Sequence, residues 1–212
     1  MKKAFLIPVL LCVLTLVATG RSYALLLSLD PSAQKIGVGD TTLVDLNISG
    51  LGNGKAPSLG AFYAEITFDE SIVFFDSVVY ASLLGDTDPS AFETEIVTTL
   101  GVGEVSLDEF SFLFDFELDA LQPSDFTLAT LSFTGLNEGT STLGFGFTDL
   151  SDAAFPASSL FPDLQTAEIT VDSDQPVPEP ATILFFVVGL IGLGGYRMRF
   201  SKKNKFSNLT SW

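Results

Sequence analysis

The chain has 212 residues, 47% of them hydrophobic and 17% charged, with no histidine and a single cysteine. Without histidine it can form neither a Ser-His-Asp triad, nor a Cys-His nucleophile, nor a histidine-ligated metal centre. Residues 25 to 176 hold 25 of the 26 acidic side chains and only Lys35 and Lys55 as bases, a formal charge of −23. This charge excludes nucleic acid and anionic lipid as partners of the segment, because both are negatively charged.

Residues 1–24 have the layout of a secretory signal peptide. Two lysines precede an apolar run over residues 4–17, and small residues lead to Ala24. This order predicts export and cleavage after Ala24. Cys12 lies within the apolar run behind Leu11, where a lipoprotein signal requires a small residue, so we expect no lipid anchor there. The exported chain would then contain no cysteine, and therefore neither a disulfide nor a thiolate site.

Between Leu25 and Val171, apolar residues recur at every second position, as they do in half-buried β-strands. The segments predicted as strands are 25–29, 44–48, 62–68, 72–79, 93–99, 110–119, 126–133, 142–147 and 167–171. Short strands separated by Gly- and Asp-rich turns predict an all-β antiparallel sandwich without a long helix. At about 150 residues, such a domain buries enough surface to fold without disulfides.

Phenylalanine is concentrated in the predicted strand 110–119. One side of this strand consists of Phe110, Phe112, Phe114, Phe116 and Leu118. Its acidic residues occupy the other side. We expect the phenylalanine stripe to line the core, because antiparallel sheets commonly bury one face and solvate the other. A ligand-binding face is the alternative interpretation of the stripe.

Two parts of this region resemble a cohesin domain. Residues 39–44, Gly-Asp-Thr-Thr-Leu-Val, and residues 60–74, which begin Gly-Ala-Phe-Tyr-Ala-Glu-Ile-Thr-Phe-Asp, are similar to its opening half. Residues 128–133, Leu-Ala-Thr-Leu-Ser-Phe, and residues 139–143, Gly-Thr-Ser-Thr-Leu, are similar to its closing half. The resemblance implies a jelly-roll β-sandwich of about nine strands. It also implies binding of a dockerin on another chain through one sheet face, or of carbohydrate as in the broader superfamily.

Two kinds of side chain could contact a ligand. Pairs of aspartates could supply oxygen ligands to Ca²⁺, or they could be solvated turn residues. These pairs are Asp86 with Asp88, Asp149 with Asp152, and Asp172 with Asp174. The aromatic residues Tyr63, Tyr80 and Phe155 could stack on sugar rings, or they could pack at strand ends.

Catalysis is not expected. A pair of carboxylates about 5 to 9.5 Å apart is enough for glycoside hydrolysis, so a glycoside hydrolase remains an alternative. However, with 25 acidic side chains in one domain such proximity arises by chance. We therefore predict no catalytic residue, and no cofactor other than Ca²⁺.

The carboxy-terminal segment has three features in a fixed order. Val177-Pro178-Glu179-Pro180 is followed by an uncharged run from Ala181 to Tyr196 and then by a basic cluster. The basic residues nearest the run are Arg197, Arg199, Lys202 and Lys203. As a helix the run would span about 24 Å, which predicts a short transmembrane helix. The basic cluster would hold the tail in the cytoplasm and leave the acidic domain outside.

This order resembles the PEP-CTERM sorting signal of Gram-negative bacteria. The resemblance implies that an exosortase, a transpeptidase-like membrane protease, recognises Pro178, Glu179 and Pro180. It further implies association with extracellular polysaccharide in a biofilm or floc matrix. The tail continues nine residues past Lys203 to Trp212, which is longer than the family pattern.

The predicted organisation has five parts. They are a signal peptide (1–24), a cohesin-like β-sandwich (25–172), a linker with the Pro-Glu-Pro motif (173–180), a transmembrane helix (181–196) and a cytoplasmic tail (197–212). The predicted function is binding without catalysis, first at the inner membrane and after processing at the cell surface or in the matrix. Polysaccharide or a secreted or surface protein is the expected partner, and a dockerin-type interaction module anchored in the membrane is the alternative.

Overall fold

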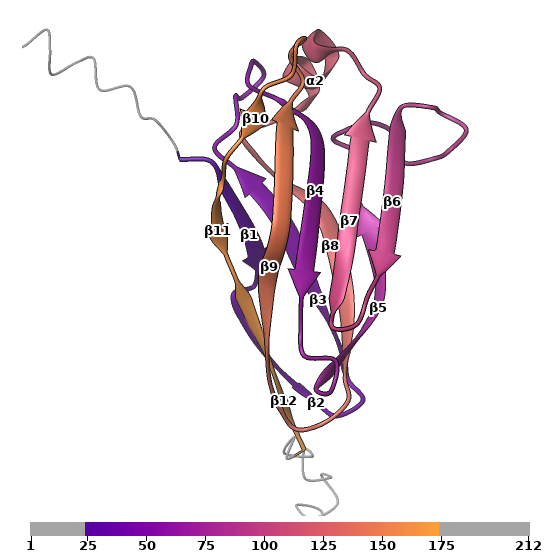
Figure 1. Ribbon diagram of the computed structural model, residues 1–212, viewed down its shortest axis with the longest axis vertical. Coiled ribbons are helices and arrows are strands. Elements are labelled where there is room, and N and C mark those ends of the chain that lie inside the picture. The colour runs from indigo at the N-terminus through magenta and orange to yellow at the C-terminus, as the bar shows by residue number, and fades with distance from the viewer. Residues whose placement is uncertain (1–23, 174–212) are drawn as a thin grey trace, which may run out of the picture. The chain divides into compact units, whose positions relative to one another are not determined.

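Two β-sheets packed face to face make up residues 24–173, the part of the chain that the computed structural model describes (Figure 1). The strands of this region are β1 Leu26–Asp30, β2 Ala33–Gly37, β3 Thr41–Ser49, β4 Leu59–Thr67, β5 Val73–Tyr80, β6 Thr94–Leu100, β7 Glu104–Ser111, β8 Asp125–Gly135, β9 Gly139–Asp152, β10 Ser159–Leu160, β11 Asp163–Gln165 and β12 Ala167–Asp172. A short helix, α2 Asp115–Leu121, lies between β7 and β8.

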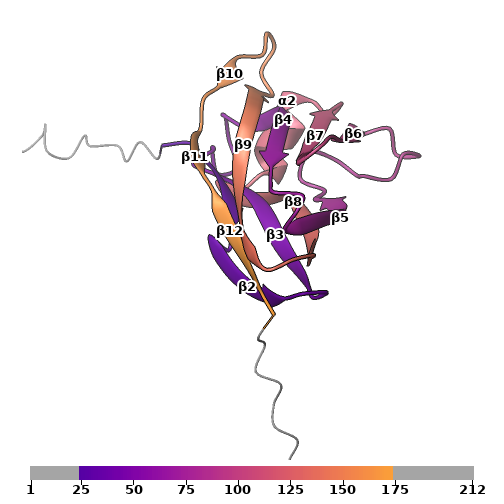
Figure 2. The same cartoon turned by 60° about the horizontal axis from the view of Figure 1, so that its bottom comes forward.

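The first sheet has the strand order β11-β1-β3-β8-β5, and the second has the order β2-β12-β9-β4-β7-β6, with β10 paired to β9. Most neighbours are antiparallel, but β1 pairs with β11 and β2 with β12 in parallel. In Figure 2, β2 runs beside β12 at the end of the sandwich opposite to α2. The amino-terminal strands therefore pair with the carboxy-terminal strands of both sheets.

The core follows from the alternation of apolar and polar residues. Val44, Leu46 and Ile48 of β3 point inward, and their polar neighbours point outward. Phe133 of β8 is fully buried, and its ring contacts the rings of Phe68 and Phe75 edge-on at 5.4 and 5.8 Å. Phe75 is the cross-strand partner of Phe133 in the same sheet, whereas Phe68 follows β4 of the other sheet, so the contact with Phe68 links the two sheets within one hydrophobic core.

The structure confirms the predicted all-β sandwich, but it has twelve strands within residues 24–173 instead of about nine. The short strands β2, β10 and β11 were not predicted, because their apolar patterns are too brief, and β7 takes the place of the predicted strand 110–119. The predicted signal peptide, the Pro-Glu-Pro motif, the transmembrane helix, the tail and Asp174 lie outside the described residues. Among residues 24–173, no helix has both the length and the apolar character needed to cross a membrane.

The predicted strand 110–119 is wrong. β7 ends at Ser111, and residues 115–121 form α2, with Leu118 as its buried residue. The last pair between β7 and β4 is Phe110 with Ala61, and the last pair between β7 and β6 is Ser111 with Thr94. Beyond Ser111 the segment pairs with no strand. The Phe112 N–H donates to the Glu93 carbonyl at 2.7 Å, and residues 115–121 then satisfy their backbone groups as a helix that closes the end of the sandwich.

Candidate functional site

The outer face of strands β9, β4, β7 and β6 carries exposed apolar side chains. Phe147 of β9, Phe110 of β7 and Val97 of β6 are all about half exposed or more. Tyr63 of β4 lies against Phe147, with ring centroids 5.8 Å apart, and its hydroxyl donates a hydrogen bond of 3.0 Å to Ser106 Oγ. We call the outward residues of these four strands the aromatic sheet face.

Carboxylates accompany these apolar residues on the aromatic sheet face. Burial raises the pKa of Asp108 on β7, and the negative charge of Glu95 on β6 raises it further. Within residues 24–173 the basic side chains are Lys35 on β2 and Lys55 in the loop between β3 and β4, and neither belongs to the four strands. The aromatic sheet face is therefore apolar and negative, and it suits a partner surface with apolar and cationic groups.

The outer face of the other sheet differs because its polar residues bond to one another. Thr130 Oγ1 of β8 donates to Asp45 Oδ1 of β3 at 2.6 Å, and Thr127 Oγ1 donates to Asn47 Oδ1 at 2.6 Å. Cross-strand pairs of this kind stabilise the sheet itself. The hydrogen-bonding groups in the middle of this face already have partners, which makes it the less suitable docking surface.

Exposed phenylalanines continue from the aromatic sheet face to the end of the sandwich that α2 covers (Figure 1). The rings of Phe110 and Phe112 meet edge-on at 5.4 Å, and those of Phe114 and Phe116 stack at 5.6 Å. All four are at least half exposed, so the expectation that they line the core is wrong. The alternative interpretation, a binding surface, agrees better with their exposure.

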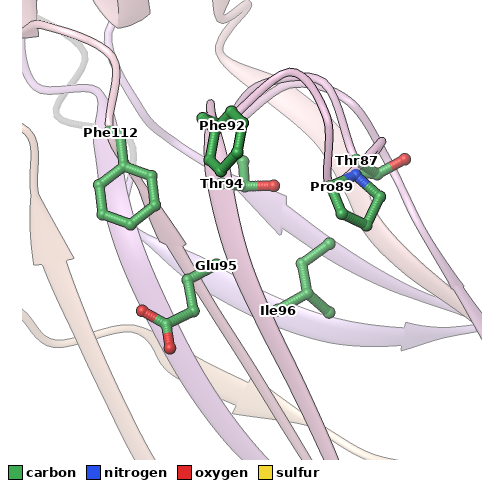
Figure 3. Close-up of a pocket in the computed structure, with 7 residues that line it drawn as sticks. All are labelled: Thr87, Pro89, Phe92, Thr94, Glu95, Ile96 and Phe112. Atoms are coloured by element: carbon green, nitrogen blue, oxygen red, sulfur yellow. The ribbon is translucent and has the colours of Figure 1, made fainter.

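Two hollows lie beside these rings. The first, of about 310 Å³, is lined by Phe112, by Glu95 and by Pro89 and Phe92 of the β5–β6 loop (Figure 3). Phe92 is 81% exposed, and its φ of 54° lies in the left-handed region that side chains rarely adopt. The second hollow, of about 580 Å³, lies between α2 and the segment that joins β9 to β10.

β7 turns an acidic side chain into the core. Val105, Leu107, Glu109 and Ser111 are its buried residues, and Glu109 is 0% exposed. Within the described part of the chain, neither carboxylate oxygen of Glu109 has a hydrogen-bond partner. Burial raises the pKa of Glu109 to about 8. The strand pattern accounts for this position, because Phe110 and Glu109 cannot both point inward.

The structure does not bring the three predicted stacking residues together. Tyr63 lies on the aromatic sheet face, and Phe155 is fully exposed in the β9–β10 segment. Tyr80 is the last residue of β5 and bonds to β6, through Thr98 Oγ1 at 2.9 Å and the Val97 carbonyl at 3.3 Å. Burial, followed by the charge of nearby carboxylates, raises the pKa of Tyr80. Its hydroxyl therefore joins the edge strands of the two sheets, and sugar stacking by these residues stays a prediction.

Three aspartates of the predicted calcium pairs, Asp86, Asp88 and Asp152, accept hydrogen bonds from residues that follow them closely in the sequence. Asp88 Oδ1 accepts hydrogen bonds from the backbone N–H and the hydroxyl of Ser90, at 2.8 and 2.7 Å, which lowers the pKa of Asp88. Asp86 Oδ1 accepts the N–H of Asp88 at 3.0 Å. Asp152 Oδ1 accepts the N–H of Ser158 at 2.7 Å. Such contacts are typical of turn residues.

Two further aspartates of these pairs lie in strands. Asp149 of β9 is opposite Tyr63 of β4. Asp172 of β12 forms an ion pair with Lys35, with 2.8 Å between Oδ2 and Nζ. The hydrogen bond from Lys35 to Asp172 raises the pKa of Lys35, and the negative charge of Asp172 raises it further. Among residues 24–173, no three carboxylates gather as a metal site would require. Calcium binding stays a prediction.

Sequence reasoning missed the end of the sandwich as a site. Phe92 was not among the predicted ligand contacts, and Phe112 and Phe114 were assigned to the core, with a ligand-binding face as the alternative. A usable signal was present, since continuing the alternation of Val105 and Leu107 places Glu109 inside and Phe110 outside. The local density of phenylalanine outweighed that signal.

Comparisons with known proteins identify the carboxy-terminal signal and the fold. Residues 176–199 match the PEP-CTERM protein-sorting motif, which confirms the sorting signal predicted from Pro178, Glu179 and Pro180. No curated protein matches the chain.

Several cohesin domains of known structure have a similar fold. The seventh ScaB type I cohesin from Pseudobacteroides cellulosolvens is 13% identical with a TM-score of 0.58, and the match covers 74% of this chain and 97% of that one. CaCohA2 from Clostridium acetobutylicum is 22% identical with a TM-score of 0.54, covering 71% and 94%. A chain of the Coh-OlpA-Doc918 type I cohesin–dockerin complex from Clostridium thermocellum is 11% identical with a TM-score of 0.56, covering 71% and 100%. These matches confirm the cohesin-like β-sandwich.

Proposed function

We propose that the chain is an exported binding module, processed by an exosortase, that holds a protein partner on the aromatic sheet face and performs no catalysis. The observation that carries this proposal is the row of outward side chains formed by the exposed Val97, Phe110 and Phe147 and the half-buried Tyr63, beside carboxylates without basic neighbours among the described residues. An exposed apolar patch of this kind on an acidic domain suits an interface with an apolar and basic protein surface.

Two similarities support the proposal. The PEP-CTERM motif at residues 176–199 is a protein-sorting signal, which favours export and recognition by an exosortase. Among the structures of similar fold are type I cohesin–dockerin complexes, in which the cohesin binds another protein. A dockerin-like partner on a separate chain is therefore the first candidate. Extracellular polysaccharide is the second, because the aromatic rings of this face could also stack on sugars.

The first test removes the aromatic pair. We expect Tyr63→Ser with Phe147→Ser to lower retention of the partner at least about tenfold, because exposed aromatic side chains supply most interface energy. Residues 25–173, which contain the whole core, would be immobilised and incubated with extracellular matrix from cells that produce the protein. Phe74→Ser, an exposed phenylalanine on the other sheet, is the matched control.

The outcomes of this test separate the candidates. Retention that disappears after protease treatment of the matrix supports a protein partner, whereas retention that survives proteolysis supports polysaccharide. Equal retention by the wild type and the double variant would contradict the assignment of the aromatic sheet face.

The second test concerns sorting. Replacing Pro178, Glu179 and Pro180 with alanine is expected to leave the precursor at its full length in cells that carry an exosortase, because the recognition residues are lost. Immunoblotting of an epitope inserted after Ala24 measures the processed fraction. Alanine at residues 173–175, just before the matched motif, is the control. Unchanged processing of the Pro-Glu-Pro variant would argue against an exosortase.

A further inference from the structure

The hollow between α2 and the β9–β10 segment forms a groove, which we call the end groove. Figure 1 shows α2 and β10 at the same end of the sandwich. Its volume is about 580 Å³, within the usual range for ligand pockets. The residues that define it are Phe110, Phe114, Asp115, Leu118, Asp152 and Phe155. Of these residues, the proposed interface on the aromatic sheet face uses only Phe110.

The α2 wall of the end groove is held in place by buried contacts. Leu118 is buried beneath α2. Gln122, which follows the helix and is also buried, accepts a hydrogen bond from the Leu59 N–H at 2.7 Å and donates one to the Leu59 carbonyl at 2.8 Å. The Ser58 hydroxyl donates to Asp119 at 2.7 Å. The helix is therefore tied to the start of β4.

The opposite wall is tied to the same strand. The Ala153 N–H donates to the Ser58 carbonyl at 3.0 Å, and the Asp152 N–H donates to the Ser158 carbonyl at 2.9 Å. The Asp152 carboxylate accepts the Ser158 N–H in return, at 2.7 Å. This segment projects past the end of β9 (Figure 2). Because both walls are fixed, a ligand would not have to order the groove when it binds.

The exposed rings of the groove contribute its apolar character. Phe155 is 100% exposed, and Phe114 is 67% exposed although its ring stacks on Phe116. Leu113, Pro156 and three alanines add further apolar surface. Burying each of these rings against a ligand would gain free energy in proportion to the apolar area removed from water.

The charges of the groove select the class of ligand. Asp115 and Asp152 line it, and no basic side chain of the described residues does. Anionic lipid and nucleic acid are repelled by this acidic domain. Neutral sugars would find few polar partners, because Ser111 and Ser151 are the uncharged hydroxyl residues of the lining.

We propose that the end groove binds a short polypeptide segment that carries apolar side chains next to lysine or arginine. The apolar side chains contact Phe114 and Phe155, and the basic groups pair with Asp115 and Asp152. This site is separate from the aromatic sheet face, which it meets only at Phe110, so it adds a second contact to the proposed function.

The test selects peptides on the immobilised domain, residues 25–173, from a phage-displayed library of short random peptides. The most enriched sequence is then synthesised, and its binding is measured by fluorescence anisotropy. We expect enriched peptides to combine aromatic or aliphatic residues with lysine or arginine. Phe114→Ser with Phe155→Ser is expected to weaken binding at least about tenfold, as loss of two central aromatic contacts does.

Matched controls separate the groove from the rest of the surface. Phe74→Ser with Phe161→Ser removes two exposed phenylalanines elsewhere and should leave binding unchanged. Asp115→Asn with Asp152→Asn should weaken binding and reduce its salt dependence, whereas Asp163→Asn with Glu168→Gln should do neither. Phe155→Ser alone, at a fully exposed position, serves if the double variant does not fold.

Three results would overturn the proposal. They are a library without enrichment, enriched peptides that bind the Phe114→Ser with Phe155→Ser variant as well as the wild type, and a glycan array whose ligands require these rings while peptides do not. Tyr63→Ser with Phe147→Ser should retain peptide binding. Failure of the end groove and failure of the aromatic sheet face are therefore distinguishable.

Discussion

Replacing Glu109 with methionine is expected to stabilise the domain by about 3 to 5 kcal/mol at pH 8 and above, and by much less near pH 4. The reason is that burial raises the pKa of Glu109 from 4.5 to about 8 in the folded state. Below pH 4.5 the carboxyl is protonated in both states. Between the two pKa values the unfolded chain releases the proton and the folded chain keeps it, so rising pH favours unfolding. Methionine removes the group that titrates.

Urea unfolding of residues 25–173 at a series of pH values measures this effect. Glu109→Gln is the matched control, because it also removes the charge but keeps a buried polar group. We expect glutamine to flatten the pH dependence as methionine does, with a smaller gain in stability. Asp108→Asn, on the exposed side of the same strand, should change the profile in the same direction but less, because its raised pKa belongs to an exposed side chain. A stability difference between wild type and the methionine variant that is constant from pH 4 to 9 would refute the buried ionisation.

Replacing Phe133 with alanine is expected to lower the free energy of unfolding by about 3 to 5 kcal/mol. Phe133 is fully buried, and its ring contacts Phe75 in its own sheet and Phe68, which follows β4 of the other sheet. Since residues 24–173 contain no cysteine, no disulfide limits the unfolded chain, and packing has to supply the stability. A loss of this size is a large share of the 5 to 15 kcal/mol or so that domains possess.

The measurement is again urea unfolding, at a pH where Glu109 keeps its proton. Phe133→Leu, which leaves a smaller cavity, should cost much less than alanine, and Phe161→Ala at an exposed position should cost almost nothing. Equal stability of the leucine and alanine variants would show that the core relaxes around the missing ring. In that case the contact between Phe133 and Phe68 would not hold the sheets together.

Alternation in the sequence predicted most of the sandwich because it is a local property. Val44, Leu46 and Ile48 are buried in β3, and Phe62, Ala64 and Ile66 are buried in β4, at the expected period of two. The Pro-Glu-Pro motif with its apolar and basic sequel was likewise identifiable, because sorting signals are linear motifs. The missing histidines exclude whole classes of active site without any structure.

The inward side of an alternating segment was ambiguous in the sequence. An alternating segment has two sides, and its pattern does not say which side meets the core when both contain phenylalanine or acid. In β7 the pairing with β4 and β6 turned Glu109 inward and Phe110 outward, against hydrophobicity. This orientation buries the carboxyl of Glu109 and places Phe110 on the aromatic sheet face.

The end of the sandwich could be known only from the tertiary structure. The phenylalanine stripe beyond Ser111 continues a strand pattern, but a strand needs paired neighbours, and the pairing of β7 with β4 and β6 stops at Ala61 and Thr94. The segment therefore becomes α2 and faces the β9–β10 segment, which is remote in sequence. Composition and alternation determined that the chain forms an acidic β-sandwich with a sorting signal. Long-range strand pairing decided which phenylalanines reach the surface, because the length of a strand depends on the strands beside it.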